Sequence, residues 1–206
     1  PLAPTDRMQT RPLCVPAEDD TRLVWLEKEA QTYSVWTRRA DAAALAEPEL
    51  LTTLPASAKP WELQATFSAD GTLWTCWAQS SRGKSEIRIL HRRPDGKSVS
   101  FSVDRGRYNY RPRMVPFGDD RIYLICDSYV DGRYDVYGCP VSSQGAGEVV
   151  RISQDAEWEN KSAICRDRDG TLWVVWVRWQ DVMYRDSTVQ QRFDLRGARL
   201  AGTSWE

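Results

Sequence analysis

The chain has 206 residues, and its 28 Lys and Arg against 29 Asp and Glu give a net charge of −1, with both signs scattered along the sequence. This balance argues against electrostatic binding to nucleic acid or to an acidic membrane surface. No apolar run approaches the ~20 residues of a membrane span, so we expect no membrane-spanning segment.

A local pattern recurs four times along the chain. Trp25, Trp77, Cys126 and Trp176 hold the same place in each copy, which we call the anchor position, and they are 52, 49 and 50 residues apart. A fixed period of this length is typical of an array built from one supersecondary unit. The sequence therefore predicts a single domain over 1–206, with approximate repeats at 12–61, 62–110, 111–160 and 161–206.

Each copy begins with an apolar strand that runs into a tight turn about seven residues before the anchor. The turn pairs are Glu18-Asp19, Asp70-Gly71, Asp119-Asp120 and Asp169-Gly170. Asp-Gly between apolar runs is a strong signal for a two-residue hairpin turn, in which both residues adopt positive φ. The second strands, around 73–77, 122–126 and 172–176, are nearly continuous apolar runs, which indicates burial on both faces.

Two more strands follow in each copy. A third strand is predicted to open at 34–36, 86–88, 135–137 and 186–188, and a shorter fourth strand at 50–53, 99–103 and 149–152. Four antiparallel strands per ~50 residues is the signature of a β-propeller blade. We therefore predict an all-β propeller of about four four-stranded antiparallel blades. The pattern leaves open whether these blades close into a ring or form part of a larger propeller.

Two segments carry a family resemblance. The runs from Cys126 to Tyr137 and from Asp169 to Trp176 resemble bacterial propeller repeats, which read in outline D-x-x-G-x-x-W-V-x-W followed by G-x-x-D-I/V-Y. Such repeats occur in TolB-type and sialidase-like propellers, and in propellers that precede PHP-type domains in proteins of unknown function. The resemblance covers roughly residues 12–200 and implies an architecture, not a chemistry.

The connections from one blade to the next are expected to surround the central channel on one face, opposite to the Asp70, Asp119 and Asp169 turns. Aromatic residues stand there beside charged and amide groups, which suits a sugar or a peptide. The predicted ligand-binding residues are Trp61, Glu62, Tyr108, Asn109, Arg111, Trp158, Glu159, Asn160 and Lys161, together with Glu27, Gln79, Ser128 and Arg178 two positions past each anchor. The alternative is that the aromatic rings simply fill gaps between blades.

No catalytic constellation is evident. His91 is the single histidine, which excludes a His-based metal cluster, and we expect it to be a partly exposed strand residue. Asp127, Asp131 and Asp135 could ligate Ca²⁺, but solvated turn acids are the favoured interpretation. We therefore expect no catalytic residue, no metal and no cofactor, and predict a non-catalytic module for carbohydrate or peptide recognition or for scaffolding. The alternative is a sialidase-like glycosidase or lyase that acts at the central channel.

Five cysteines without paired C-x-x-C spacing argue against a zinc site and a complete disulfide framework. Cys14 and Cys165 both lie eleven residues before an anchor, so a closed ring would bring them together, either as a disulfide or as two small core residues. We expect an extracytoplasmic protein with a carbohydrate or protein partner, and self-association or a fused domain if the propeller is incomplete.

Overall fold

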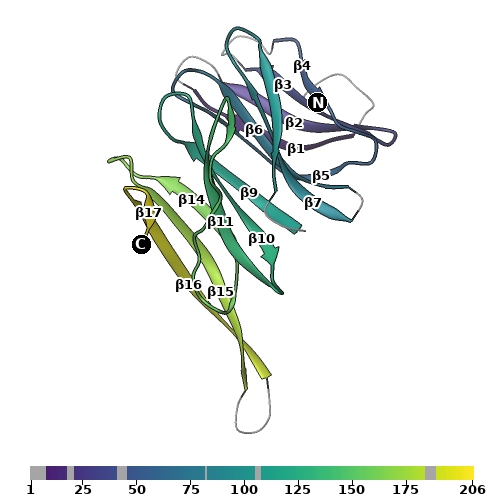
Figure 1. Cartoon of the computed structure of the whole chain (residues 1–206). Helices are drawn as coiled ribbons and strands as arrows, with labels where there is room; N and C mark the ends of the chain where they lie inside the picture. Colours follow the sequence, from purple (N-terminus) through teal and green to yellow (C-terminus); the bar gives the residue numbers. More distant parts are fainter. Residues whose placement is uncertain (1–7, 18–20, 41–45, 82, 105–107, 184–188) are drawn as a thin grey trace.

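The computed structural model describes the chain except for residues 1–7, 18–20, 41–45, 82, 105–107 and 184–188 (Figure 1). The described residues form seventeen β-strands and no helix, so none of them forms a helix that could cross a membrane. The prediction of an all-β protein is confirmed.

Each sequence repeat folds as an antiparallel meander. The first repeat holds β1 (Met8–Val15), β2 (Arg22–Glu29), β3 (Thr32–Arg39) and β4 (Glu49–Thr53). The second holds β5 (Lys59–Phe67), β6 (Leu73–Ser81), β7 (Lys84–Arg92) and β8 (Ser98–Val103). The third holds β9 (Tyr108–Pro116), β10 (Ile122–Val130), β11 (Arg133–Ser142), β12 (Gly145–Ala146) and β13 (Val150–Arg151). The fourth holds β14 (Trp158–Arg166), β15 (Leu172–Met183), β16 (Val189–Ala201) and β17 (Ser204–Trp205).

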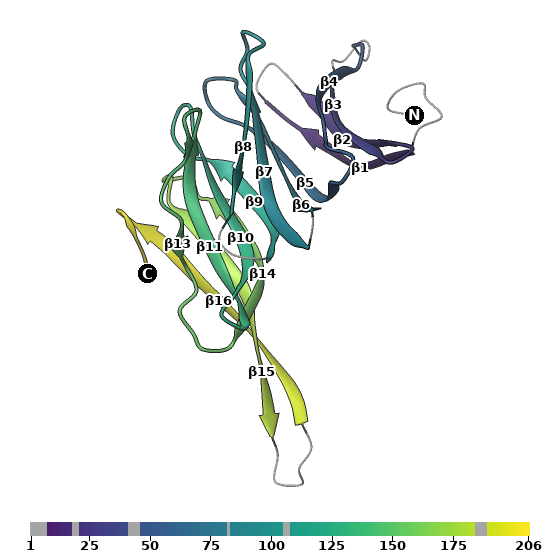
Figure 2. The same ribbon diagram turned by 45° about the vertical axis from the view of Figure 1, so that its right-hand side comes forward.

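The strands fall into three hydrogen-bonded sheets, because the second and third repeats share a nine-stranded sheet. One parallel pair, Ser85 with Tyr108, joins β7 to β9. The sheets form an open arc, with the first and last repeats at its two ends (Figures 1 and 2). The predicted count of four blades is therefore not confirmed, and no closed ring forms. Cys14 and Cys165 are free and exposed, so the disulfide suggested for a closed ring does not form.

Three buried apolar clusters hold the arc together, one between each pair of successive repeats. They form because side chains alternate between the two faces of a strand. In β10, Ile122, Leu124 and Cys126 pack on the second repeat, whereas Tyr123 and Ile125 pack on the fourth. The apolar runs around Trp77 and Cys126, the anchors of the two inner repeats, therefore face two neighbouring sheets, as their unbroken hydrophobicity predicts.

The far face of the fourth repeat has no such neighbour among the described residues. Trp173 and Val175 on β15 hold the places of Tyr123 and Ile125 on β10, yet their exposed fractions are 41% and 50%. Leu195 on β16 is 81% exposed. The same strand positions that make a core between inner repeats thus form an apolar surface here.

The hairpins after the first strands are three-residue loops, not the predicted two-residue turns. The Ser68 amide donates to the Thr72 carbonyl at 3.1 Å, and of the turn pair only Gly71 has positive φ, +78°. The Asp70 carboxylate fixes this loop, because it accepts the Thr72 amide at 3.0 Å and the Ser68 hydroxyl at 2.6 Å. Residues 167–171 repeat the geometry. The Glu18-Asp19 pair lies outside the described residues.

Gly138 on β11 offers a test of the packing between the third and fourth repeats. A Cβ at this position would lie 2.8 Å from Tyr123 Cε1 and 2.9 Å from Ile152 Cδ1. Gly138→Ala is therefore expected to lower the free energy of unfolding by about 1–3 kcal/mol in urea titrations. The control is Gly96→Asn, because a Cβ at Gly96 meets nothing within 4 Å and Asn tolerates its φ of +84°. Equal effects at both sites would contradict the packing described.

Candidate functional site

The first strand of every repeat is interrupted at the same place. β1, β5, β9 and β14 each lose their register with the second strand over two or three residues. At the interruption one residue has a left-handed backbone, Arg11 at φ +53°, Glu62 at +55°, Arg111 at +50° and Lys161 at +56°. A bulge re-aims the side chain it carries, and left-handed non-glycine residues cluster at functional sites. The bulges therefore mark the positions at which a strained backbone directs charged side chains.

Three of these bulges, those of β5, β9 and β14, border a pocket of about 220 Å³ that we call the inner-strand pocket. Three repeats contribute to it. The second repeat supplies β5, the third supplies β9, β10 and β11, and the fourth supplies β14. The first strand of the third repeat, β9, contacts both β5 and β14. The lining residues are Glu62, Tyr110, Arg111, Asp127, Tyr134 and Asn160. The pocket thus gathers two carboxylates, one guanidinium, one amide and two phenols.

Arg111 lies between the two carboxylates. Its Nε is 3.8 Å from Glu62 Oε1, and its Nη1 is 3.6 Å from Asp127 Oδ2. Arg113 places a second guanidinium 3.6 Å from Glu62 Oε2. That Oε2 atom is buried, and it accepts no hydrogen bond from the described part of the chain. Glu62 therefore has an acceptor oxygen available inside a positively charged setting.

Asp127 has a very different environment. Its side chain is 1% exposed, and it accepts hydrogen bonds from the Lys161 amide at 2.7 Å and from the Ser162 hydroxyl at 2.6 Å. These bonds fix the bulge of β14 against β10. Burial nevertheless raises the pKa of Asp127 above its usual value, while the Ser162 hydroxyl, the Lys161 amide and Arg111 partly offset that rise. The two carboxylates of the pocket therefore differ in accessibility and in hydrogen bonding.

An aromatic cluster extends from the pocket across three repeats. The ring centroids of Trp61 and Tyr110 are 6.0 Å apart, those of Tyr110 and Tyr134 5.9 Å, and those of Tyr134 and Trp158 5.6 Å. All members are half-buried, so each keeps an exposed portion of its ring. The cluster consists of Trp61, Tyr108, Tyr110, Tyr129, Tyr134, Trp158 and Trp179.

Seven of the thirteen predicted ligand-binding residues belong to this region. Glu62, Arg111 and Asn160 line the pocket, and Lys161 borders it through its bulge. Trp61, Tyr108 and Trp158 belong to the aromatic cluster.

The other six predicted residues have structural partners or lie in the interior. Asn109 bonds to Ser85, Asp104 and Ser128, and Gln79 bonds to Trp77 and Glu86. Arg178 is paired with Asp155 and Asp194, and Glu27 is buried.

Glu159 is the most completely enclosed carboxylate among these predicted residues. None of its surface is exposed, and it accepts the Trp176 indole N–H at 2.6 Å. Burial raises the pKa of Glu159 above its usual value. Its contact with the anchor tryptophan indicates a role in holding β14 to β15.

Sequence reasoning missed Asp127, Tyr110 and Tyr134 as pocket residues. The interpretation of Asp127 and Asp135 as solvated turn acids is wrong, because both are buried and Asp135 is paired with Arg133 and Arg151. No spacing rule links Asp127 to the bulge of the next repeat. The described residues contain no cluster of carboxylates, His and Cys that could hold a metal.

His91 also differs from expectation. The sequence predicts a partly exposed strand residue, whereas its side chain is 1% exposed and its ring lies 4.9 Å from that of Trp74. Burial lowers the pKa of His91 below its usual value. This histidine therefore belongs to the interior of the second repeat.

No family model matches the sequence, and no curated protein matches it. Solved structures do match its fold. A thermostable family-43 glycoside hydrolase has a TM-score of 0.56 at 11% identity, over 96% of this chain and 74% of that one. Neuraminidase-like proteins from A/bat/Guatemala/164/2009 and from A/little yellow-shouldered bat/Guatemala/060/2010 have TM-scores of 0.56 and 0.55 at 9% and 10% identity. This chain spans 54% and 58% of their lengths, and 90% and 91% of it is covered.

These similarities support the sialidase-like propeller architecture at the level of the fold, whereas they give no support for a TolB-type propeller or one that precedes a PHP-type domain. They also overturn one prediction. The prediction of a non-catalytic recognition or scaffold module, and with it the absence of enzymatic activity, is contradicted, because the matching structures include a family-43 glycoside hydrolase.

Proposed function

We propose that the chain is a carbohydrate-active enzyme that hydrolyses a glycosidic bond at the inner-strand pocket. The observation that supports this most is the convergence of Glu62 and Asp127 on either side of Arg111. Glycoside hydrolysis uses two carboxyl groups that flank the scissile bond, one as an acid and the other as a base or nucleophile. Two carboxyl groups in contrasting environments can divide these roles.

The different environments of Asp127 and Glu62 support the following division of the acid and base roles. Asp127 is the acid, because burial favours its protonated form, and it gives its proton to the leaving glycosidic oxygen. Glu62 is the base, because its Oε2 accepts no hydrogen bond from the described residues and can take a proton from a water molecule whose oxygen attacks the anomeric carbon. Arg111 and Arg113 place two guanidiniums beside Glu62. Tyr134 is an unfavourable nucleophile, since burial and the neighbouring Tyr110 raise its pKa.

The aromatic cluster supplies the binding surface. Half-buried Trp and Tyr rings offer flat apolar faces with polar edges, against which sugar rings can stack. Because the cluster runs over three repeats, we propose a substrate of several linked sugar units. Polysaccharides occur outside the cytoplasm, so we propose that the enzyme is extracytoplasmic.

A lyase is the second candidate, and the paired guanidiniums favour it. In that reaction Glu62 would remove the proton next to a uronate carboxylate, and Arg111 would neutralise the carboxylate's charge. The two activities differ in product, because elimination leaves an unsaturated sugar and hydrolysis does not.

The test is a screen of oligosaccharides and polysaccharides for new reducing ends, with ultraviolet absorbance to detect unsaturated products. Asp169→Asn is the matched control, because Asp169 is an exposed carboxylate at the opposite end of the strands. Cleavage of at least one glycan by both the wild type and Asp169→Asn is expected. Failure to cleave any member of a panel that covers neutral and acidic glycans would count against the proposal.

The pH profile of that activity is a further prediction. The acid must be protonated, so kcat is expected to fall as the pH rises through the raised pKa of Asp127, and this alkaline limb should lie above the ordinary value of 3.8. Asp127→Asn should remove the limb along with most of the activity. A profile that is flat on the alkaline side in the wild type would contradict the assignment of Asp127.

A further inference from the structure

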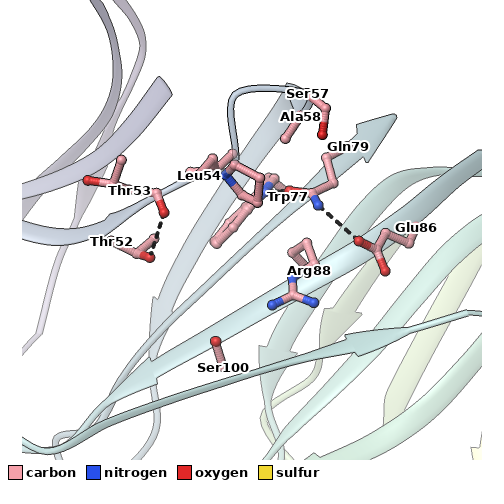
Figure 3. A pocket seen from close by; sticks show the side chains of 11 residues that line it. Thr52, Thr53, Leu54, Ser57, Ala58, Trp77, Gln79, Glu86, Arg88 and Ser100 are labelled. Carbon is pink, nitrogen blue, oxygen red and sulfur yellow. Dashed lines mark hydrogen bonds between the residues drawn. The ribbon is translucent and has the colours of Figure 1, made fainter. Parts of the chain in front are cut away.

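A second pocket lies between the first two repeats, away from the inner-strand pocket. It has a volume of about 230 Å³, and no residue is shared between the two. Its walls come from β4 and the connection after it, and from β6, β7 and β8 (Figure 3). The lining combines apolar side chains such as Leu54 and Trp77 with polar ones, which are Thr52, Thr53, Ser57, Gln79, Glu86, Arg88 and Ser100.

Arg88 is the unusual member of this pocket. The other half-buried guanidiniums among the described residues are paired, as Arg111 is with Glu62 and Asp127, and Arg178 with Asp155 and Asp194. Arg88 has no hydrogen bond or ion pair within the described chain. A guanidinium offers five donors in a fork that matches a carboxylate. Its position half-buried in a pocket, without an acceptor, therefore points to an anionic group supplied by a ligand.

Two positions before Arg88 on the same face of β7, Glu86 presents an oriented acceptor. The Trp77 indole donates to Gln79 Oε1 at 2.9 Å, and Gln79 Nε2 in turn donates to Glu86 Oε1 at 2.9 Å. This chain of bonds fixes the Glu86 carboxylate, which keeps further acceptor capacity for hydroxyl groups. Figure 3 shows the Gln79–Glu86 bond at one side of the pocket and the Arg88 guanidinium between Trp77 and Ser100.

Arg88 and Glu86 together fit one class of ligand. Arg88 can bind a carboxylate, whereas Glu86 repels a bare anion but accepts hydrogen bonds from hydroxyls. Pockets for drug-sized ligands have about 300–1,000 Å³, so about 230 Å³ suits a single sugar unit. We propose that this pocket binds a carboxylate-bearing sugar, a uronate, with its carboxylate on Arg88 and its hydroxyls on Glu86. The proposal does not depend on the catalytic assignment.

The experiment is a titration of the whole protein with sodium glucuronate, followed through the indole N–H resonance of Trp77, which donates into the pocket wall. Saturable shifts of this resonance are expected in the wild type, while glucose should bind at least tenfold more weakly because it lacks the carboxylate. Acetate should also bind more weakly, because Glu86 disfavours an anion without hydroxyls.

Arg88→Gln should weaken glucuronate binding at least tenfold, and Arg88→Lys should weaken it too, since an ammonium lacks the planar fork. The control is Arg168→Gln, which changes an exposed guanidinium in the fourth repeat and should leave binding unchanged. Absence of saturable binding in the wild type, equal binding of glucose, or unchanged binding by the folded Arg88→Lys variant would each overturn the proposal.

Discussion

Glu62→Gln is expected to lower kcat by about 10²–10⁴-fold on any glycan the wild type cleaves, which is the usual loss when a positioned acid or base is removed. The amide keeps the size and shape of the carboxylate, but it cannot take a proton from water. Arg111 and Arg113 lose a charged partner, yet these pairs are 3.6–3.8 Å apart and partly exposed, so the fold should be retained. Initial rates at saturating glycan, with circular dichroism as a check on folding, measure the effect.

Two comparisons sharpen this prediction. Arg113→Lys preserves a positive charge near Glu62 and should retain a larger share of kcat than Glu62→Gln does. Asp169→Asn should behave as the wild type. If Glu62→Gln keeps more than about half of the wild-type kcat, Glu62 makes no transition-state contribution and the site lies elsewhere.

Trp77→Ala is expected to lower the free energy of unfolding by about 3–5 kcal/mol, the usual cost of removing a large core side chain. Trp77 is 3% exposed and belongs to the cluster between the first and second repeats. Its indole also donates to Gln79, which loses a buried partner. Trp176→Ala should cost a similar amount, because its side chain is 6% exposed in the cluster between the third and fourth repeats.

Trp173→Ala provides the matched control. Trp173 is 41% exposed on the far face of the fourth repeat, and its indole donates to Asp167 at 2.8 Å. Truncation there should cost less than about 1.5 kcal/mol, because little apolar surface returns to water and one exposed hydrogen bond is lost. Chemical denaturation of the three variants measures the difference. A loss below about 1 kcal/mol at both Trp77 and Trp176 would contradict the assignment of the interfaces.

The sequence predicts the strands well, because the signals that encode them are local. The anchors and the apolar runs before them lie in the second strands of the repeats. Their nearly continuous hydrophobicity correctly predicts burial on both faces of β6 and β10, but not of β15. The predicted fourth strands at 50–53 and 99–103 match β4 and β8. The predicted third strand at 186–188 lies outside the described residues.

The site was less predictable, because its geometry depends on contacts between repeats. The bulges at Glu62 and Arg111 leave no composition signal, since neither residue is a glycine. The Asp127 carboxylate accepts a hydrogen bond from the Lys161 amide in the bulge of β14, and the two residues are 34 positions apart in the sequence. The turn type was missed for a similar reason, because the Asp70 side chain selects a three-residue loop that the Asp-Gly pair alone does not specify.

The three clusters between repeats also govern how the structure opens. Each contact surface joins only neighbouring repeats, so stability adds up along the arc as in a one-dimensional chain of coupled units. The second and third repeats are each held by two such surfaces and by a shared sheet, whereas the first and fourth are each held by one. Local unfolding should therefore begin at the two ends. The inner-strand pocket, centred on β9 and β10 of the third repeat, lies in the part of the chain that opens last.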